Sequence, residues 1–174
     1  MKPVARNLSY EVDVKQLHDA IQLMAKTLNL QATSISVWMQ AREELHELID
    51  PVEALIEACE TVNLADDDDL RRFVFEYLEV DPYYYWSGHI KEKLLTKIKK
   101  LDFSEEECEI IRALVLRRIE KRALREFKHI CRLIRKVETK GFHESVMDRS
   151  KSRDSRVKRR AEFALGYFYE DMGS

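Results

Sequence analysis

The scarcity of glycine and proline most strongly limits what this chain can fold into. Among 174 residues there are 4 Gly and 3 Pro, together roughly a third of their average usage. These two residue types form most tight turns, because glycine reaches positive φ and proline fixes φ for a turn. With so few of them the chain needs long regular segments, and we expect helices rather than the many short strands of a sandwich or barrel.

Apolar residues recur at helical spacing along most of the chain. The spacing predicts helices over 13–29 and 34–49. Asp50-Pro51 matches an N-cap followed by proline at the first position of a third helix, which reaches about residue 62. The four consecutive aspartates at 66–69 suit the start of the next helix, because negative charge stabilises a helix N-terminus.

The second half of the chain contains the longest helical pattern. Ser104 and Glu107 form a capping-box sequence, and the apolar arc that follows predicts a helix over 105–137. Ile110 and Leu114 lie off this arc, so the first turns either bury a different face or form a separate helix. A polar segment then separates this helix from a last one that ends near Tyr169. Together the patterns predict an all-α fold of about seven helices, either a multi-helix bundle or a short helical array.

The chain is long enough to bury a core without disulfide or metal staples. We interpret residues 1–174 as a single all-helical domain and leave open a subdivision into 1–64 and 65–174. The cysteines, odd in number and without Cys-x-x-Cys spacing, argue against a disulfide framework or a thiolate metal site: Cys59, Cys108 and Cys131. The N-terminus lacks the apolar core of a secretion signal, and no run of 18 apolar residues occurs. We therefore expect a cytoplasmic protein that does not enter a membrane.

A formal net charge of −2 conceals two opposed blocks of charge. Residues 43–69 contain eleven carboxylates and no Lys or Arg, whereas residues 117–160 contain 17 Lys or Arg and 6 Asp or Glu. Such segregation indicates that charge is used in association, because net charge governs encounter with a partner more than it governs the fold.

If residues 105–137 form one helix, seven basic side chains share a face opposite Phe127, Ile130 and Ile134. These residues, here called the basic stripe, are Arg118, Lys121, Arg125, Lys128, Arg132, Arg135 and Lys136. Few acidic residues lie within one turn of them. The leading hypothesis is a non-catalytic helical adaptor that binds an acidic macromolecular partner, a protein or a second copy of the chain, through this face. A face that is merely solvated, or one that binds nucleic-acid phosphates, is the alternative.

Four aromatic residues follow one another before a Ser-Gly pair: Tyr83, Tyr84, Tyr85 and Trp86. No regular structure buries four consecutive side chains on one face. Asp81 before Pro82 resembles a helix start, and Ser87 suits an N-cap for the helix that follows. We expect a packed corner with some rings exposed. An anchor for a protein partner and a platform for base stacking are the alternatives.

The segment DSRVKRRAEFALG, residues 154–166, resembles the opening of the second helix of a HEAT-type repeat. An aspartate turn precedes a valine with a basic residue after it, and small or apolar residues follow at Ala161, Ala164 and Leu165. The resemblance covers 13 residues and implies a HEAT-like helical array.

A second segment, IQLMAKTLNLQATSISVWMQ at residues 21–40, is similar to the helix-turn-helix motif of bacterial regulators. Ala25 stands where a small residue permits close helix approach, and Asn29 stands at the turn. The resemblance implies a reading helix that presents five polar side chains to DNA: Gln31, Thr33, Ser34, Ser36 and Gln40. A DNA-binding regulator is therefore the second hypothesis, although the acidic block at 43–69 would repel DNA.

No sequence pattern indicates catalysis. Glu43/His46 and Glu126/His129 share the Glu-x-x-His spacing of di-iron bundles, but helical projection directs Glu43 to solvent and sets His129 beside basic side chains. There is no Gly-rich phosphate loop and no recognisable nucleophile arrangement. We expect a protein that is not an enzyme, with no metal and no cofactor. A small inhibitor or immunity-type protein that uses the acidic block 43–69 is the third hypothesis.

Overall fold

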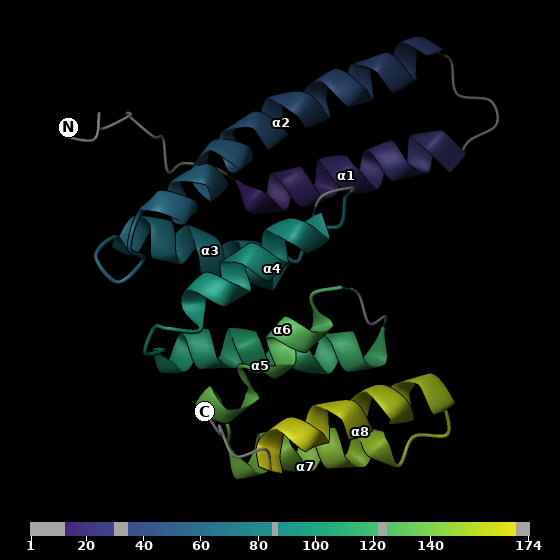
Figure 1. Ribbon diagram of the computed structural model, residues 1–174. Helices are drawn as coiled ribbons and strands as arrows, with labels where there is room; N and C mark the ends of the chain where they lie inside the picture. Colours follow the sequence, from purple (N-terminus) through teal and green to yellow (C-terminus); the bar gives the residue numbers. More distant parts are fainter. Residues whose placement is uncertain (1–12, 30–34, 85–86, 122–124, 170–174) are drawn as a thin grey trace. The chain divides into compact units, whose positions relative to one another are not determined.

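A computed structural model describes residues 13–29, 35–84, 87–121 and 125–169 (Figure 1). Every regular element in these ranges is a helix, and none is a strand, so the all-α prediction is confirmed. The chain divides into two compact units, residues 1–87 and residues 88–174. None of the helices within the described ranges has an apolar stretch long enough to cross a bilayer.

The described residues of the N-terminal unit form three helices. They are α1 (Val14–Asn29), α2 (Ile35–Thr61) and α3 (Asp68–Val80). Helices α1 and α2 pack together, and α3 packs on both. The core includes Leu17 and Ile21 of α1, Leu55 of α2 and Tyr77 of α3, all of them buried. Asp13 caps α1, because its carboxylate accepts a hydrogen bond from the backbone amide of Gln16 at 2.9 Å.

Pro51 lies inside α2, so the prediction that a new helix starts at Asp50-Pro51 is wrong. Proline in a helix interior removes one backbone hydrogen bond and crowds the preceding turn, at a cost of about 3 kcal/mol. The apolar face nevertheless continues across it, with Leu45, Val52, Ile56 and Cys59 buried on the same helix. Burial of such side chains contributes about 1.5–3 kcal/mol each, which offsets the cost of the proline.

Helix α3 begins and ends at aspartates. The Asp67 carboxylate accepts a hydrogen bond from the Leu70 amide at 2.9 Å, which confirms that the aspartate run at 66–69 starts a helix. Asp81 ends the helix in the left-handed conformation, with φ 56° and ψ 51°. Asp81-Pro82 therefore ends a helix and does not start one, and the next helix begins at Ser87. The residue before proline is excluded from the right-handed helical region, and aspartate tolerates the left-handed one.

The C-terminal unit contains five α-helices and one short 3-10 helix in the described ranges. They are α4 (Ser87–Ile98), α5 (Glu105–Glu120), α6 (Phe127–Cys131), η1 (Ile134–Lys136), α7 (Lys140–Ser150) and α8 (Ser155–Tyr169). The capping box of Ser104 and Glu107 is present at the start of α5. The prediction of one helix over 105–137 is wrong, because α5 ends at Glu120 and the later residues form α6 and η1.

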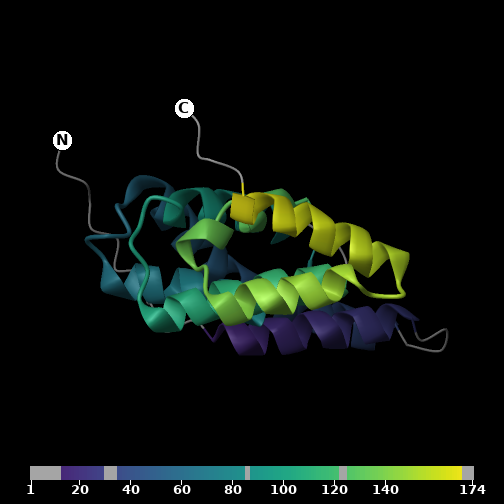
Figure 2. The same ribbon diagram turned by 90° about the horizontal axis from the view of Figure 1, so that it is seen from below.

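Helices α7 and α8 form a hairpin that lies against α5 (Figures 1 and 2). Two arginines of this hairpin bind the C-terminal end of α5. Arg160 donates to the carbonyl oxygens of Ile119 at 2.6 Å and Glu120 at 3.2 Å, and Arg149 Nε donates to the Glu120 carboxylate at 2.8 Å. The last carbonyls of a helix have no partner within the helix, so these contacts stabilise the end of α5 at Glu120.

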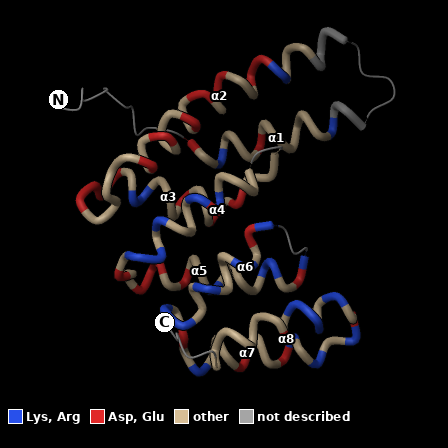
Figure 3. Tube along the Cα trace, in the orientation of Figure 1, with Lys and Arg blue, Asp and Glu red and all other residues tan. Residues whose placement is uncertain are grey.

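The two units have opposite net charge. Residues 1–87 carry 7 Lys or Arg and 17 Asp or Glu, a net charge of −10, and residues 88–174 carry 23 and 15, a net charge of +8. Figure 3 shows the acidic residues along α2 and at the start of α3. The boundary lies after residue 87 rather than near residue 64, because α3 packs with α1 and α2.

Candidate partner-binding surfaces

The seven residues of the basic stripe lie on separate segments of the C-terminal unit. Arg118 lies on α5, and Lys121 is the C-cap of that helix. Arg125 precedes α6, Lys128 lies on α6, and Arg132 is its C-cap. Arg135 and Lys136 lie on η1. Because these segments are not one continuous helix, the stripe is not the single helix face that the projection assumed.

Arg118 is buried in an ion pair. Its Nη2 lies 3.1 Å from Oε1 of Glu126, and the two side chains are 7% and 0% exposed. The other carboxylate oxygen faces the first turn of α4, where a Cβ added to Gly88 would lie 3.5 Å from it. The positive end of the α4 dipole favours a carboxylate at this place. Arg118 and Glu126 therefore hold the C-terminal unit together and are not accessible to a partner.

Two more residues of the basic stripe are engaged within the unit. Arg125 Nε donates to Glu92 Oε2 at 2.7 Å, and His129 Nε2 lies 3.2 Å from the other oxygen of this carboxylate. The hydrogen bond from Arg125 is the main cause that lowers the pKa of Glu92 below its ordinary value. Lys136 Nζ donates to the carbonyl of Leu101 at 2.7 Å.

The remaining four residues of the basic stripe are exposed: Lys121, Lys128, Arg132 and Arg135. Among the described residues, the first three make no ion pair and no side-chain hydrogen bond. These four residues are the part of the stripe that is exposed and takes no part in the contacts described above, while Arg125 and Lys136 are exposed but engaged within the unit.

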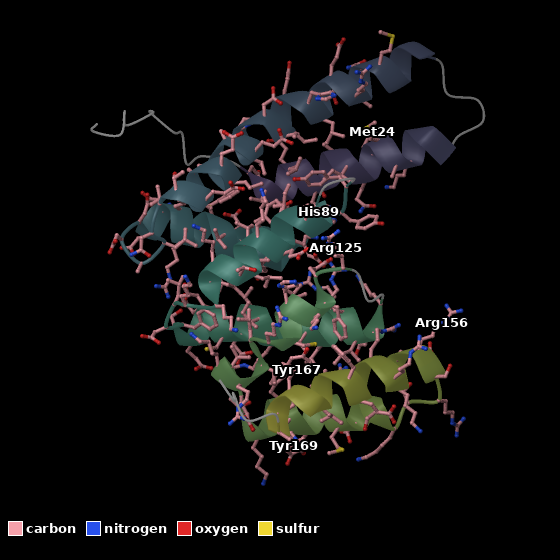
Figure 4. All side chains as sticks on the ribbon, viewed as in Figure 1. Met24, His89, Arg125, Arg156, Tyr167 and Tyr169 are labelled. Carbon is pink, nitrogen blue, oxygen red and sulfur yellow. The ribbon has the colours of Figure 1, made fainter. Side chains whose placement is uncertain are left out.

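Two basic residues of α8 are followed by two aromatic residues on the same side of the helix. Arg156, Arg159, Phe163 and Tyr167 follow one another at spacings of three, four and four residues, which places them on one side of the helix. Phe163 is 45% exposed, and its ring lies 5.5 Å from that of Tyr167 in an edge-on arrangement. Figure 4 shows Arg156 and Tyr167 toward opposite ends of α8. These four residues are here called the α8 stripe.

Two contacts hold the α8 stripe in place. The Asp154 carboxylate accepts hydrogen bonds from the amides of Arg156 at 2.7 Å and Val157 at 3.3 Å, and these bonds lower the pKa of Asp154. At the middle of the stripe, the rings of Phe163 and Phe127 lie 5.7 Å apart, which joins α8 to α6. The exposed basic residues of α6 and the α8 stripe are thus carried by neighbouring helices.

Comparison with protein-family models, with curated proteins and with solved structures finds no match. The function is therefore inferred from the surfaces described above.

The α8 stripe was missed at the level of sequence, although its pattern was visible there. The HEAT-like resemblance of residues 154–166 rests on the aspartate turn and the small residues, and it does not involve the spacing of Arg156, Arg159 and Phe163. Continuing the 3-4-4 spacing to Tyr167 identifies the stripe without a structure.

The aromatic run is described at its first two residues. Tyr83 is 56% exposed. Tyr84 is half-buried, and its hydroxyl accepts a hydrogen bond at 2.9 Å from the hydroxyl of Tyr77. Ser87 lies in the first turn of α4, where its hydroxyl donates to the Tyr84 carbonyl at 2.7 Å. Tyr85 and Trp86 lie outside the described residues.

Most of the side chains that the helix-turn-helix resemblance assigns to DNA reading also lie outside the described part of the chain. This holds for Gln31, Thr33 and Ser34, and for the side chain of Ser36, whose backbone lies in α2. Gln40 is exposed, and its amide donates to Glu44 at 3.0 Å. Helix α2 extends over 27 residues and is therefore much longer than the two short helices of that motif.

The two Glu-x-x-His pairs lie in different units. Glu43 and His46 are exposed on α2 in the N-terminal unit, whereas Glu126 pairs with Arg118 and His129 with Glu92 in the C-terminal unit. Within the described ranges no cluster of three or more His, Cys, Asp or Glu side chains has the arrangement of a metal site.

Proposed function

We propose that the protein is a non-catalytic helical adaptor whose C-terminal unit binds an acidic protein partner. The observation that supports this proposal is the α8 stripe, in which two exposed arginines are followed by two aromatic rings on one side of a helix. Arg156 and Arg159 make no ion pair among the described residues. Arginine pairs with carboxylates through two parallel hydrogen bonds, and aromatic rings provide apolar contact area at an interface.

The surface proposed for the partner extends beyond α8. Phe163 and Phe127 join α8 to α6, so Lys128 and Arg132 contribute positive charge from the neighbouring helix. The HEAT-like array is part of this proposal, and two features of that repeat type support it: the α7–α8 hairpin and the aspartate turn at Asp154. A reducing compartment such as the cytoplasm fits the three buried cysteines, which form no disulfide.

The proposal is tested by titrating the full chain into a fluorescein-labelled peptide of alternating glutamate and leucine. We expect saturable binding that weakens with added salt. Arg156→Glu plus Arg159→Glu should weaken it at least about tenfold, because like charges then face each other. The matched control, Lys140→Glu plus Lys151→Glu on the α7 side of the hairpin, makes the same charge change and should alter Kd less than about threefold.

Two other results would redirect the proposal. Equal loss of binding in both double variants would mean that only overall charge matters, and the α8 stripe would have no special role. Binding of a 20-base-pair DNA duplex, measured in parallel, tests whether the partner is a nucleic acid rather than a protein. Duplex binding that survives the α8 substitutions but is lost on Gln31→Ala plus Ser34→Ala would support the helix-turn-helix regulator instead.

A further inference from the structure

An open groove runs between α1 and α2 in the N-terminal unit, with a volume of about 690 Å³. Its floor is apolar: α1 contributes Ile21, Met24 and Ala25, and α2 contributes Leu45 and Ile49. Ile21 and Leu45 also belong to the core, and Met24 lies on the side of α1 that faces α2 (Figure 4). Methionine adapts its shape to different apolar partners, so this floor suits side chains inserted from outside.

One rim of the groove is acidic. His46, Asp50 and Glu53 of α2 line it, and the same side of α2 continues along the helix with Glu57 and Glu60. Spacings of four, three, four and three residues place these five side chains in one row. All five residues are exposed, so four carboxylates stand in a row beside the apolar floor.

The other rim consists of Tyr83 and Tyr84. Tyr84 is fixed from several sides, because its hydroxyl accepts from Tyr77 and its backbone amide donates to Ser87 Oγ at 3.0 Å. Burial is the main cause that raises the pKa of Tyr84, and the negative charge of Glu53, which lines the same groove, raises it further. Tyr83 is more than half exposed and offers its ring to an incoming group.

We propose that this groove binds a cationic amphipathic helix of a partner protein. A helix laid in a groove inserts apolar side chains at spacings of three and four residues, which matches the apolar floor. Its basic side chains would then meet the carboxylates of Asp50, Glu53 and Glu57, and one of them would lie over the Tyr83 ring. The net charge of −10 on this unit attracts a cationic helix and repels an acidic one.

This inference does not depend on the proposed function of the C-terminal unit. The groove and the α8 stripe lie in different units and attract opposite charges. Either surface can fail its test without affecting the other. If both bind, the protein connects a cationic partner to an acidic one.

The test uses the full chain and a labelled 18-residue peptide with leucines at helical spacing on one face and lysines on the other. Two control peptides separate the contributions: a scrambled peptide of the same composition, and a peptide with glutamate in place of every lysine. We expect saturable binding of the first peptide, at least about tenfold weaker binding of the scrambled one, and no binding of the acidic one.

Variants of the protein locate the binding site. Asp50→Lys plus Glu53→Lys should weaken binding of the lysine peptide at least about tenfold. Glu44→Lys plus Glu47→Lys makes the same charge change on another side of α2 and should leave Kd within about threefold. Tyr83→Ala, at an exposed position that preserves the fold, should weaken binding about threefold or more.

Several outcomes would overturn the proposal. These are no saturable binding by the wild type up to about 100 μM peptide, equal binding of the ordered and scrambled peptides, and equal effects of the two double variants. Self-association of the wild type, measured by light scattering and abolished by Asp50→Lys plus Glu53→Lys, would identify a second copy of the chain as the occupant instead.

Discussion

The buried pair of Arg118 and Glu126 is the interaction with the largest predicted effect at the scale of single residues. Removing one member of a buried pair leaves an uncompensated charge, which costs about 3–5 kcal/mol. We expect Glu126→Gln to lower the free energy of unfolding by about this amount in urea titrations. The exposed pair of Arg72 and Asp69 is the control, where Asp69→Asn should cost less than about 1 kcal/mol.

A double variant tests whether burial explains the effect. Arg118→Met plus Glu126→Met replaces both charges with apolar side chains, and we expect it to be more stable than Glu126→Gln alone. If the single substitution of Glu126 is as mild as that of Asp69, the pair is not buried in solution.

Cys131 provides a prediction about pH. Burial raises the pKa of its thiol from 9.0 to about 12, so the folded state keeps the thiol protonated while the unfolded state ionises. The resulting stabilisation is complete below pH 9 and is lost as the pH rises toward 12. Relative to Cys131→Val, the wild type should lose about 1.4 kcal/mol of unfolding free energy per pH unit above 9. Parallel curves for the two proteins would contradict the burial of this thiol.

At the scale of elements, Pro51 distinguishes one long helix from two. If α2 is continuous, Pro51→Ala restores a backbone hydrogen bond and should raise the free energy of unfolding by about 1–3 kcal/mol in urea titrations. If Asp50-Pro51 instead started a new helix, proline would suit its first position, and the same substitution would change stability little or lower it. Glu47→Ala, at an exposed position one turn earlier, is the control.

Local signals in the sequence predicted several helix starts, although not that at Asp50-Pro51, whereas distant contacts determined where some helices end. Asp13, Asp67 and Ser104 each bind an amide within three residues, so the sequence around them is sufficient. The end of α5 at Glu120 depends on Arg160, some 40 residues later in the chain. Apolar spacing alone continues past residue 120, which is why one helix over 105–137 was expected.

The difference between local signals and distant contacts also explains which candidate sites could be predicted from the sequence. The α8 stripe lies on one helix, so the spacing of its four residues in the sequence, compared with the helical period, is enough to predict it. The groove combines α1, α2 and the segment after α3, and no local pattern shows that Tyr83 and Glu53 line the same groove. The basic stripe failed as a continuous face because its projection assumed one helix.

At the scale of the whole molecule, the division of charge between the units predicts unusual behaviour on ion exchangers. A chain of net charge −2 is ordinarily not retained by a cation exchanger at pH 7. Because one unit carries −10 and the other +8, we expect retention on both anion and cation exchangers at low salt. Arg156→Glu plus Arg159→Glu should elute earlier from the cation exchanger, and Asp50→Lys plus Glu53→Lys earlier from the anion exchanger. Passage of the wild type through the cation exchanger without retention would contradict the expectation that the positive unit binds the exchanger independently of the negative one.

The binding of α5 by Arg149 and Arg160 has a consequence for the order in which the protein forms on the ribosome. The N-terminal unit is contiguous in sequence, so all of its contacts become available once residue 87 has emerged, and domains generally fold as units during synthesis. The Ile119 carbonyl near the end of α5 receives its hydrogen bond only when Arg160, 41 residues later, has been synthesised. A nascent chain that stops before residue 160 should therefore carry a folded acidic unit joined to an unfinished basic one. Such a chain is an expected substrate for chaperones that bind exposed apolar segments.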